Sequence, residues 1–264
     1  MRQQFPIYSI AKTFLAQAVL ELELPLAKRA GDFVDGLPQV YSQCTIEGLL
    51  NHSAGLSDYS QLSAYQGAVT SKLPAWPRDD LLQTAQTLPN NYIGFQYSNV
   101  GYLLLRMLVE KQTGLSFFNA IRELVLEPLK ITGFDEWETT SDLVAGYDPK
   151  WVYSGTFAAT EKSLLDGYLA LIHNRHQTTG LGMGLVPVPY SDTGFDNPHY
   201  GLGLMTEKAS EDGTPLYVGH GGGGPGYSHM ILVNTSTWNI GLESSTDNFD
   251  QSEAIKHLRL KTSN

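Results

Sequence analysis

The spacing of apolar residues divides the chain into a helical majority and a final stretch of strands. From Ser9 to about Leu22, apolar residues recur at helical intervals, so that Ala11, Leu15 and Ala18 share one stripe with Leu22. The same spacing predicts further helices at 45–50, 79–88, 100–112, 116–127 and 160–174. Their expected end signals are Thr45, Gly114, Ser116, Pro128 and Thr160. The polar stretch 56–78, with its two prolines, predicts a long surface loop.

The last quarter of the chain changes to strand patterns with short turns. Strands are predicted at 200–208, 214–219, 227–234 and 238–245, with turns at 211–213 and 236–239, and a helix follows at 250–260. Consecutive strands with short connections form an antiparallel meander, which gives an α+β fold class. We therefore expect a mainly helical lobe at 1–190 and an antiparallel sheet with a C-terminal helix at 191–264.

Composition excludes several classes of function. The 264 residues are 42% apolar and 17% charged, which is typical of a globular protein with a substantial core. The net charge is −10 and no run of Lys or Arg occurs, which argues against nucleic acid or an anionic membrane as a partner. Cys44 is the only cysteine, so no internal disulfide forms, and we interpret it as a small buried residue.

The sequence also gives no sign of a metal site or a membrane span. The seven histidines are scattered, and neither a CxxC nor an HExxH pattern occurs. No apolar stretch is long enough to cross a bilayer, and no signal peptide is visible. We expect neither a metal nor another cofactor.

The first candidate for chemistry is Ser9-Ile-Ala-Lys12, which places a hydroxyl and an amine one helical turn apart. Such a pair occurs often by chance, and the alternative is a helix-capping serine beside a solvated lysine. Its context favours function, because the strand-like Phe-Pro-Ile-Tyr leads into Ser9 and an apolar helix follows. Ser9 would then lie at a helix N-terminus, where backbone N–H groups and partial positive charge surround its oxygen.

The second candidate is Tyr97-Ser98-Asn99, which opens the predicted helix at 100–112. Its simplest interpretation is a loop tyrosine followed by two helix-capping residues. The functional alternative places the Tyr97 phenol and the Asn99 amide in a cleft. A cation near Tyr97 would lower the pKa of its phenol and make it a general base.

The third candidate is the run from His220 through Gly221, Gly222 and Gly223. A strand is expected to end at His220, and the glycines could be a flexible hairpin loop. Alternatively, bare backbone at Gly221 and Gly222 lets a substrate approach closely. The N–H groups of Ser9 and Gly223 would then form an oxyanion hole.

Together, the three motifs resemble those of the class C β-lactamase-related serine hydrolases, a family that includes penicillin-binding proteins, D-alanyl-D-alanine carboxypeptidases and β-lactamase-fold esterases. The segments at 49–56, 127–134, 157–171, 200–204 and 219–228 carry the same resemblance, so it extends over nearly the whole chain. It implies a β-lactamase/transpeptidase-like fold whose site lies between the helical lobe and the sheet.

The resemblance also implies a role for each motif residue. Ser9 would be the nucleophile, and Lys12 would hold it and help to take its proton. Tyr97 would protonate the leaving group and activate water, while Asn99 would orient Lys12 and the substrate. His220 stands where many relatives have lysine and would titrate near pH 6.5. We interpret His52 as a structural residue that is hydrogen-bonded to a nearby loop.

The departures from the family pattern bear on the substrate. Gly221 and its neighbours replace the hydroxyl residues that would bind a substrate carboxylate, and such hydrogen bonds contribute about 1.5–3 kcal/mol each. This favours esters, or amides without that carboxylate, with an esterase or a D-amino-acid peptidase as the leading hypothesis. The alternatives are a penicillin-binding D-Ala-D-Ala carboxypeptidase or β-lactamase, a protein that is acylated by β-lactams without turnover, and a non-catalytic binding relative. Its expected partner is a small-molecule or peptide-like substrate.

The position of Ser9, so near the first residue, raises a further expectation. In the family, a first helix and two strands precede this motif, and one of those strands pairs beside the last strand of the meander. The sequence thus indicates a fragment of a longer protein, in which the strand at 238–245 becomes an open edge able to self-associate. Localisation stays open, because a parent with a signal peptide would be periplasmic or extracellular and one without it cytoplasmic.

Overall fold

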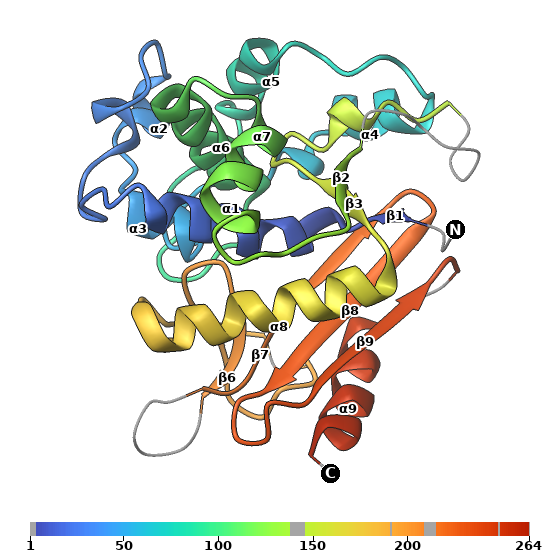
Figure 1. Cartoon of the computed structure of the whole chain (residues 1–264). Coiled ribbons are helices and arrows are strands. Elements are labelled where there is room, and N and C mark those ends of the chain that lie inside the picture. Colours follow the sequence, from blue (N-terminus) through green and yellow to red (C-terminus); the bar gives the residue numbers. More distant parts are fainter. Residues whose placement is uncertain (1–3, 138–145, 191, 209–214, 248, 264) are drawn as a thin grey trace.

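The N-terminal helix lies at the centre of the helical part of the molecule. The structure is a computed structural model that describes residues 4–137, 146–190, 192–208, 215–247 and 249–263. A short strand, β1 (Phe5–Pro6), leads through a 3₁₀ turn, η1 (Tyr8–Ile10), into α1 (Ala11–Glu21). Residues 11–19 of α1 are all buried, including Lys12. The predicted stripe of Ala11, Leu15 and Ala18 is buried, and so are the other sides of α1, because other elements surround it (Figure 1).

The remaining helices of this part agree largely with the sequence pattern. They are α2 (Gln39–Ser42), α3 (Ile46–Leu50), α4 (Ser63–Thr70), α5 (Arg78–Ala85), α6 (Asn99–Thr113) and α7 (Phe117–Ile121), with single turns η2 (Ala30–Asp32), η3 (Tyr59–Gln61), η4 (Arg122–Leu126) and η6 (Pro149–Trp151). Two predicted end signals are confirmed: Thr45 accepts a hydrogen bond from the Gly48 N–H, and Gly114 ends α6 with a φ of 71°. Cys44 is buried, as expected.

The stretch 56–78 is not the surface loop that its polar composition predicts. It contains η3 and α4, and both Leu56 and Tyr59 are almost fully buried. Tyr59 packs against Tyr65 and Tyr153, which anchors this segment to the core. Aromatic side chains spaced among polar residues thus provide the packing that decides the conformation here.

Two sheets complete the fold. In the small sheet, β3 (Phe157–Ala159) lies between β1 and β2 (Phe134–Glu136), and all pairs are antiparallel. Thr160 then caps α8 (Glu161–Thr178) by accepting a hydrogen bond from the Ser163 N–H, as predicted. The large antiparallel sheet has the order β4-β5-β6-β7-β8-β9. Its strands are β4 (Val186–Pro187), β5 (Pro198–Tyr200), β6 (Met205–Lys208), β7 (Pro215–Gly224), β8 (Tyr227–Asn234) and β9 (Ile240–Ser245).

Three strand predictions need correction. The sheet begins with β4, before the boundary expected at residue 190. The predicted strand 200–208 is interrupted by a turn, because Gly203 has a φ of 76° and its N–H donates to the Leu50 carbonyl. The strand expected to end at His220 continues to Gly224, since Gly221 to Gly224 pair with Tyr227 to Met230. The predicted turn at 211–213 lies outside the described residues.

The two faces of the large sheet are covered by different elements. Val218, Ile231 and Val233 join the main core on the face towards α1 and α8. A smaller core on the opposite face joins the sheet to α9 (Gln251–Thr262) through Phe195, Tyr217, Met230, Leu232, Ala254, Ile255 and Leu258. Figure 1 shows α8 and α9 on either side of β8 and β9. Within the described residues, no helix is long and apolar enough to span a membrane.

Strand β9 forms one end of the large sheet as far as the described residues show. Trp238 precedes β9 and adopts a φ of 58°, and its ring stacks on His173 of α8 at 3.9 Å between ring centroids. It packs against the same core as Ile240 and Leu242, as their alternation predicts. Self-association through this edge stays a prediction, which sedimentation of the chain would test.

Candidate active site

The three sequence motifs meet at one cleft of about 470 Å³. Ser9, Tyr97 and His220 border it, together with the glycines at 221–223. The size is that of a site for a small molecule. Tyr97 and His220 follow Ser9 by nearly 90 and by more than 200 residues in the sequence. The fold brings all three to a single site.

Ser9 is presented to the cleft by a strained turn. The preceding residue, Tyr8, has a φ of 48°, a left-handed conformation that is uncommon for a bulky side chain. The Tyr8 phenol compensates by donating a hydrogen bond to the Pro225 carbonyl at 2.5 Å. This contact joins the turn that carries Ser9 to the tip of the β7–β8 hairpin.

The glycines of β7 let the strand pack against this turn. A Cβ on Gly222 would lie 2.4 Å from the Ile7 carbonyl oxygen, and one on Gly224 would lie 2.4 Å from the Tyr8 ring. Only at Gly223 would a Cβ meet nothing closer than 3.5 Å. The absent side chain of Gly222 makes room for the turn that carries Ser9. Gly222 also borders the cleft, and the expectation that its backbone contacts a substrate stays a prediction.

A matched pair of substitutions tests this packing. We expect Gly222→Ala to lower the free energy of unfolding by about 1–3 kcal/mol, because the added methyl group collides with backbone. Gly223→Ala should be nearly neutral, since neither glycine has a positive φ and residue 223 has room. Urea denaturation of both variants measures the difference, and equal losses would contradict the explanation.

Lys12 is completely buried, and its amine points at Ser9. Its Nζ donates hydrogen bonds to Ser9 Oγ at 2.8 Å, to Asn99 Oδ1 at 2.7 Å and to Ser154 Oγ at 3.4 Å. Burial lowers the pKa of Lys12 from 10.5 to about 7, and the charge of Asp58 opposes that shift only in part. At neutral pH, Lys12 is therefore a neutral amine in a large fraction of the molecules. This is the form that can accept the Ser9 proton.

The phenol of Tyr97 donates a hydrogen bond to Ser9 Oγ at 3.1 Å. Its ring lies 5.2 Å from Lys12 Nζ. The expected lowering of the Tyr97 pKa is nevertheless wrong: burial raises this pKa above its usual value, and the hydrogen bond with Ser9 counteracts burial only partly. In this structure the Tyr97 phenol is a protonated hydrogen-bond donor, and Lys12 is the group whose pKa suits a base.

Asp58 is a residue of this site that sequence reasoning missed. Its Oδ2 accepts hydrogen bonds from the Asn99 backbone N–H at 2.9 Å and from Asn99 Nδ2 at 2.7 Å. These contacts fix the amide so that its oxygen faces Lys12. A single aspartate in a polar stretch gives no sequence signal, because only the packing of α6 against η3 brings it to Asn99.

Asp58 should therefore tune the pH dependence of the site. Its negative charge raises the pKa of Lys12, so Asp58→Asn should lower that pKa further and move the rise of kcat/KM to lower pH. The asparagine oxygen can still accept a hydrogen bond from Asn99. A pH–rate profile of the variant that is unchanged, or displaced to higher pH, would disprove this coupling.

His220 is buried and hydrogen-bonded at both ring nitrogens. Its Nδ1 lies 2.6 Å from the Gly221 carbonyl oxygen, and its Nε2 lies 2.8 Å from the Tyr200 hydroxyl. Burial, followed by the charge of Lys12, lowers the pKa of His220 from 6.5 to about 3. The expectation that His220 titrates near pH 6.5 is therefore wrong, because a neutral ring donates to the carbonyl and accepts from Tyr200 throughout the neutral range.

His52 is hydrogen-bonded to the loop that carries Tyr97, Ser98 and Asn99, as expected from the sequence. Its Nδ1 accepts a hydrogen bond from the Ser98 N–H at 3.1 Å, and its carbonyl accepts one from the Gln96 N–H at 2.8 Å. Its ring lies 4.3 Å from that of Tyr97, between centroids. Across the described residues, no group of three or more His, Cys, Asp or Glu side chains could hold a metal ion.

Comparison with known proteins places this geometry in a family. A penicillin-binding protein of Bacillus subtilis is 24% identical over 265 residues, which cover 86% of this chain and 57% of that protein. The solved penicillin-binding protein homologue of Pyrococcus abyssi superposes with a TM-score of 0.74 at 21% identity, covering 98% of this chain and 65% of the other. The D-amino acid amidase of Ochrobactrum anthropi gives 0.71 at 19% identity, covering 100% of this chain and 86% of the other.

These superpositions show a β-lactamase/transpeptidase-like fold. The family model described as Beta-lactamase matches residues 2–246, nearly the whole chain. With Ser9, Lys12 and Tyr97 held together by hydrogen bonds at the cleft, the chain belongs to the Beta-lactamase family.

Proposed function

We propose that this protein is a serine hydrolase that works through an acyl-enzyme on esters or on amides without a free carboxylate. The observation that carries the proposal is the pair of hydrogen bonds to Ser9 Oγ, one from Lys12 at 2.8 Å and one from Tyr97 at 3.1 Å. A serine contacted by a lysine of lowered pKa and by a protonated phenol has both a base and an acid within reach.

The geometry supports one order of proton transfers. Neutral Lys12 takes the Ser9 proton as Oγ attacks the substrate carbonyl, and the N–H groups of Ser9 and Gly223, which both border the cleft, stabilise the oxyanion. Tyr97 gives its proton to the leaving group, and the ammonium of Lys12 restores that proton to Tyr97. Water then attacks the acyl-enzyme with the same groups acting in reverse, which releases the acid and returns Ser9.

Related proteins support hydrolysis and differ in substrate. The relatives include penicillin-binding proteins and D-amino acid amidases. Among the described residues that line the cleft, none is a lysine or an arginine that could bind a penicillin carboxylate. An esterase or D-amino-acid amidase therefore fits this cleft better than a β-lactamase or a carboxypeptidase.

Labelling and turnover separate the alternatives. A fluorophosphonate should label wild-type protein at Ser9, whereas an unlabelled protein would indicate a non-catalytic binding relative. Steady-state hydrolysis of p-nitrophenyl butanoate should then exceed that of a chromogenic cephalosporin. Stable labelling by fluorescent penicillin with no ester turnover would instead favour a β-lactam-binding protein.

A further inference from the structure

We propose that the cleft selects uncharged substrates whose acyl group carries an aromatic or bulky apolar side chain, and that Gln251 sets the preference for neutral groups. This inference rests on the proposed hydrolase function and names its substrate class. It is carried by the composition of the cleft walls and by the place that the Gln251 side chain occupies.

The walls of the cleft are mainly aromatic and aliphatic, formed by Phe95, Val188, Tyr190, Phe195, Met205 and Phe249. None of the described lining residues is Asp, Glu, Lys or Arg. The nearby Lys12 side chain is completely buried, and its Nζ is hydrogen-bonded to Ser9. A charged substrate group would therefore give up its water without gaining an ion-pair partner, which is costly.

The aromatic walls already form ring pairs that a substrate ring can extend. Phe95 meets Tyr190 edge-on at 6.1 Å and Tyr200 at a tilt of 40° and 5.6 Å, between ring centroids. Tyr190 is half exposed, so part of its ring remains free at the cleft. Offset and edge-to-face ring pairs are favourable, and an aromatic acyl group gains from both contacts.

Gln251 fills the space where a side chain on the His220–Gly223 segment would otherwise lie. Its Oε1 is 2.4 Å from the position that a Cβ on Gly221 would take. Its Nε2 makes only a weak contact with Met205 Sδ at 3.8 Å among the described residues. This carboxamide, at the first residue of α9, is thus available to donate to a substrate carbonyl and to accept from a substrate N–H.

Two carboxylates that are next in sequence to residues of the cleft wall oppose an anionic substrate. Asp192 and Asp250 stand next in sequence to the lining residues Thr193 and Gln251, and the Asp192 side chain is 82% exposed. Lys256 Nζ lies 3.9 Å from Asp192 Oδ1 and 2.7 Å from Glu253 Oε1, so these two carboxylates share one cation. The chain as a whole carries a net charge of −10. Long-range repulsion of an anionic substrate therefore adds to the cost of desolvating its charge inside the cleft.

Matched p-nitrophenyl esters test the substrate class. We expect wild-type kcat/KM to fall from 4-phenylbutanoate to pentanoate, and to fall again by about tenfold or more for hydrogen glutarate, which differs from pentanoate by a terminal carboxylate. The 4-trimethylammoniobutanoate ester should also be slower than pentanoate. Equal or faster use of either charged ester, or no gain from the phenyl ring, would overturn the proposal.

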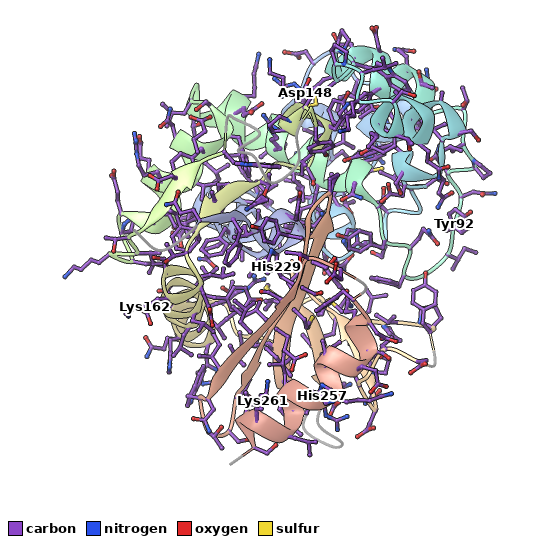
Figure 2. The ribbon with its side chains drawn as sticks, turned by 90° about the vertical axis from the view of Figure 1, so that its right-hand side faces the viewer. Tyr92, Asp148, Lys162, His229, His257 and Lys261 are labelled. Atoms are coloured by element: carbon purple, nitrogen blue, oxygen red, sulfur yellow. The ribbon has the colours of Figure 1, made fainter. Side chains whose placement is uncertain are left out.

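Substitution at Gln251 tests its role. Gln251→Lys should raise the ratio of glutarate to pentanoate hydrolysis about tenfold, because it supplies a cation at the cleft wall. The matched control His257→Lys places an ammonium on α9 at a side chain that is 60% exposed, labelled in Figure 2, and it should leave the ratio unchanged. Equal effects of the two variants would show that the overall charge of the protein, and not the position of the lysine, changes the ratio. That result would overturn the assignment to Gln251.

A second variant and a labelling step keep the outcomes distinct. If Gln251→Lys melts early, Ser228→Lys places a cation on the same side of β7, since Ser228 Oγ lies 3.5 Å from a Cβ built on Gly223. The ratio should rise with it as well, and an unchanged ratio in this folded variant counts against the proposal. Absence of fluorophosphonate labelling at Ser9 in the wild type would overturn the hydrolase function together with this inference. Labelling without charge discrimination would overturn the substrate class alone.

Discussion

Ser9→Ala is expected to reduce kcat for ester hydrolysis by roughly 10³- to 10⁶-fold, the range seen when a nucleophilic serine is removed. The substitution deletes the single oxygen that both Lys12 and Tyr97 contact, so no other group can form the acyl-enzyme. The measurement is steady-state hydrolysis of a p-nitrophenyl ester, together with intact mass after treatment with a fluorophosphonate.

The control for this variant is Ser236→Ala, which removes an exposed serine from the turn before β9. It should keep wild-type activity and labelling, and both variants should melt close to the wild type. A fluorophosphonate adduct on the Ser9→Ala protein would show that another residue is the nucleophile.

Lys12→Met is expected to lower kcat/KM by roughly 10²- to 10⁴-fold at pH 8, the contribution typical of a general base. In the wild type, kcat/KM should rise with pH and inflect near 7, because Lys12 must lose its proton before it can accept one from Ser9. That inflection should be absent from the residual activity of the variant. An inflection near 7 that persists in Lys12→Met would assign it to another group.

The pH dependence of the free energy of unfolding gives a second test of the lowered Lys12 pKa. Folding lowers the pKa of Lys12 from 10.5 to about 7, so the unfolded chain binds more protons than the folded one between these values. The contribution of Lys12 therefore makes the folded state more stable as pH rises through this interval. The variant should lack this part of the pH dependence of the free energy of unfolding, which urea denaturation at several pH values measures.

Lys12 and Tyr97 should also act as a unit. Both contact the same oxygen, and the proposed proton transfers pass through both. The double variant Lys12→Met/Tyr97→Phe should therefore lose little more than the worse single variant. Losses that multiply would indicate two independent roles.

The sequence alone determined much of the local structure. The helix ends at Thr45, Gly114 and Thr160 follow from capping oxygens and from the left-handed freedom of glycine, which act within a few residues. The spacing of Ser9 and Lys12 likewise places both on one face of a turn, and the structure brings them to 2.8 Å. Short-range interactions can be predicted because the residues that make them are close together in the sequence.

The chemistry of the site was decided only by the tertiary structure. Lys12 and His220 are fully or almost fully buried, and Tyr97 is partly buried. Their pKa values therefore follow mainly from desolvation, which depends on residues far away in the chain. Neither Asp58 nor Gln251 stands in a recognisable sequence pattern. Only the packing of η3 on α6 brings Asp58 to Asn99, and only the packing of α9 on the sheet brings Gln251 to the cleft. The glycines of β7 show the same limit: the sequence predicts room along the backbone, and the fold decides that Ile7 and Tyr8 take that room at Gly222 and Gly224.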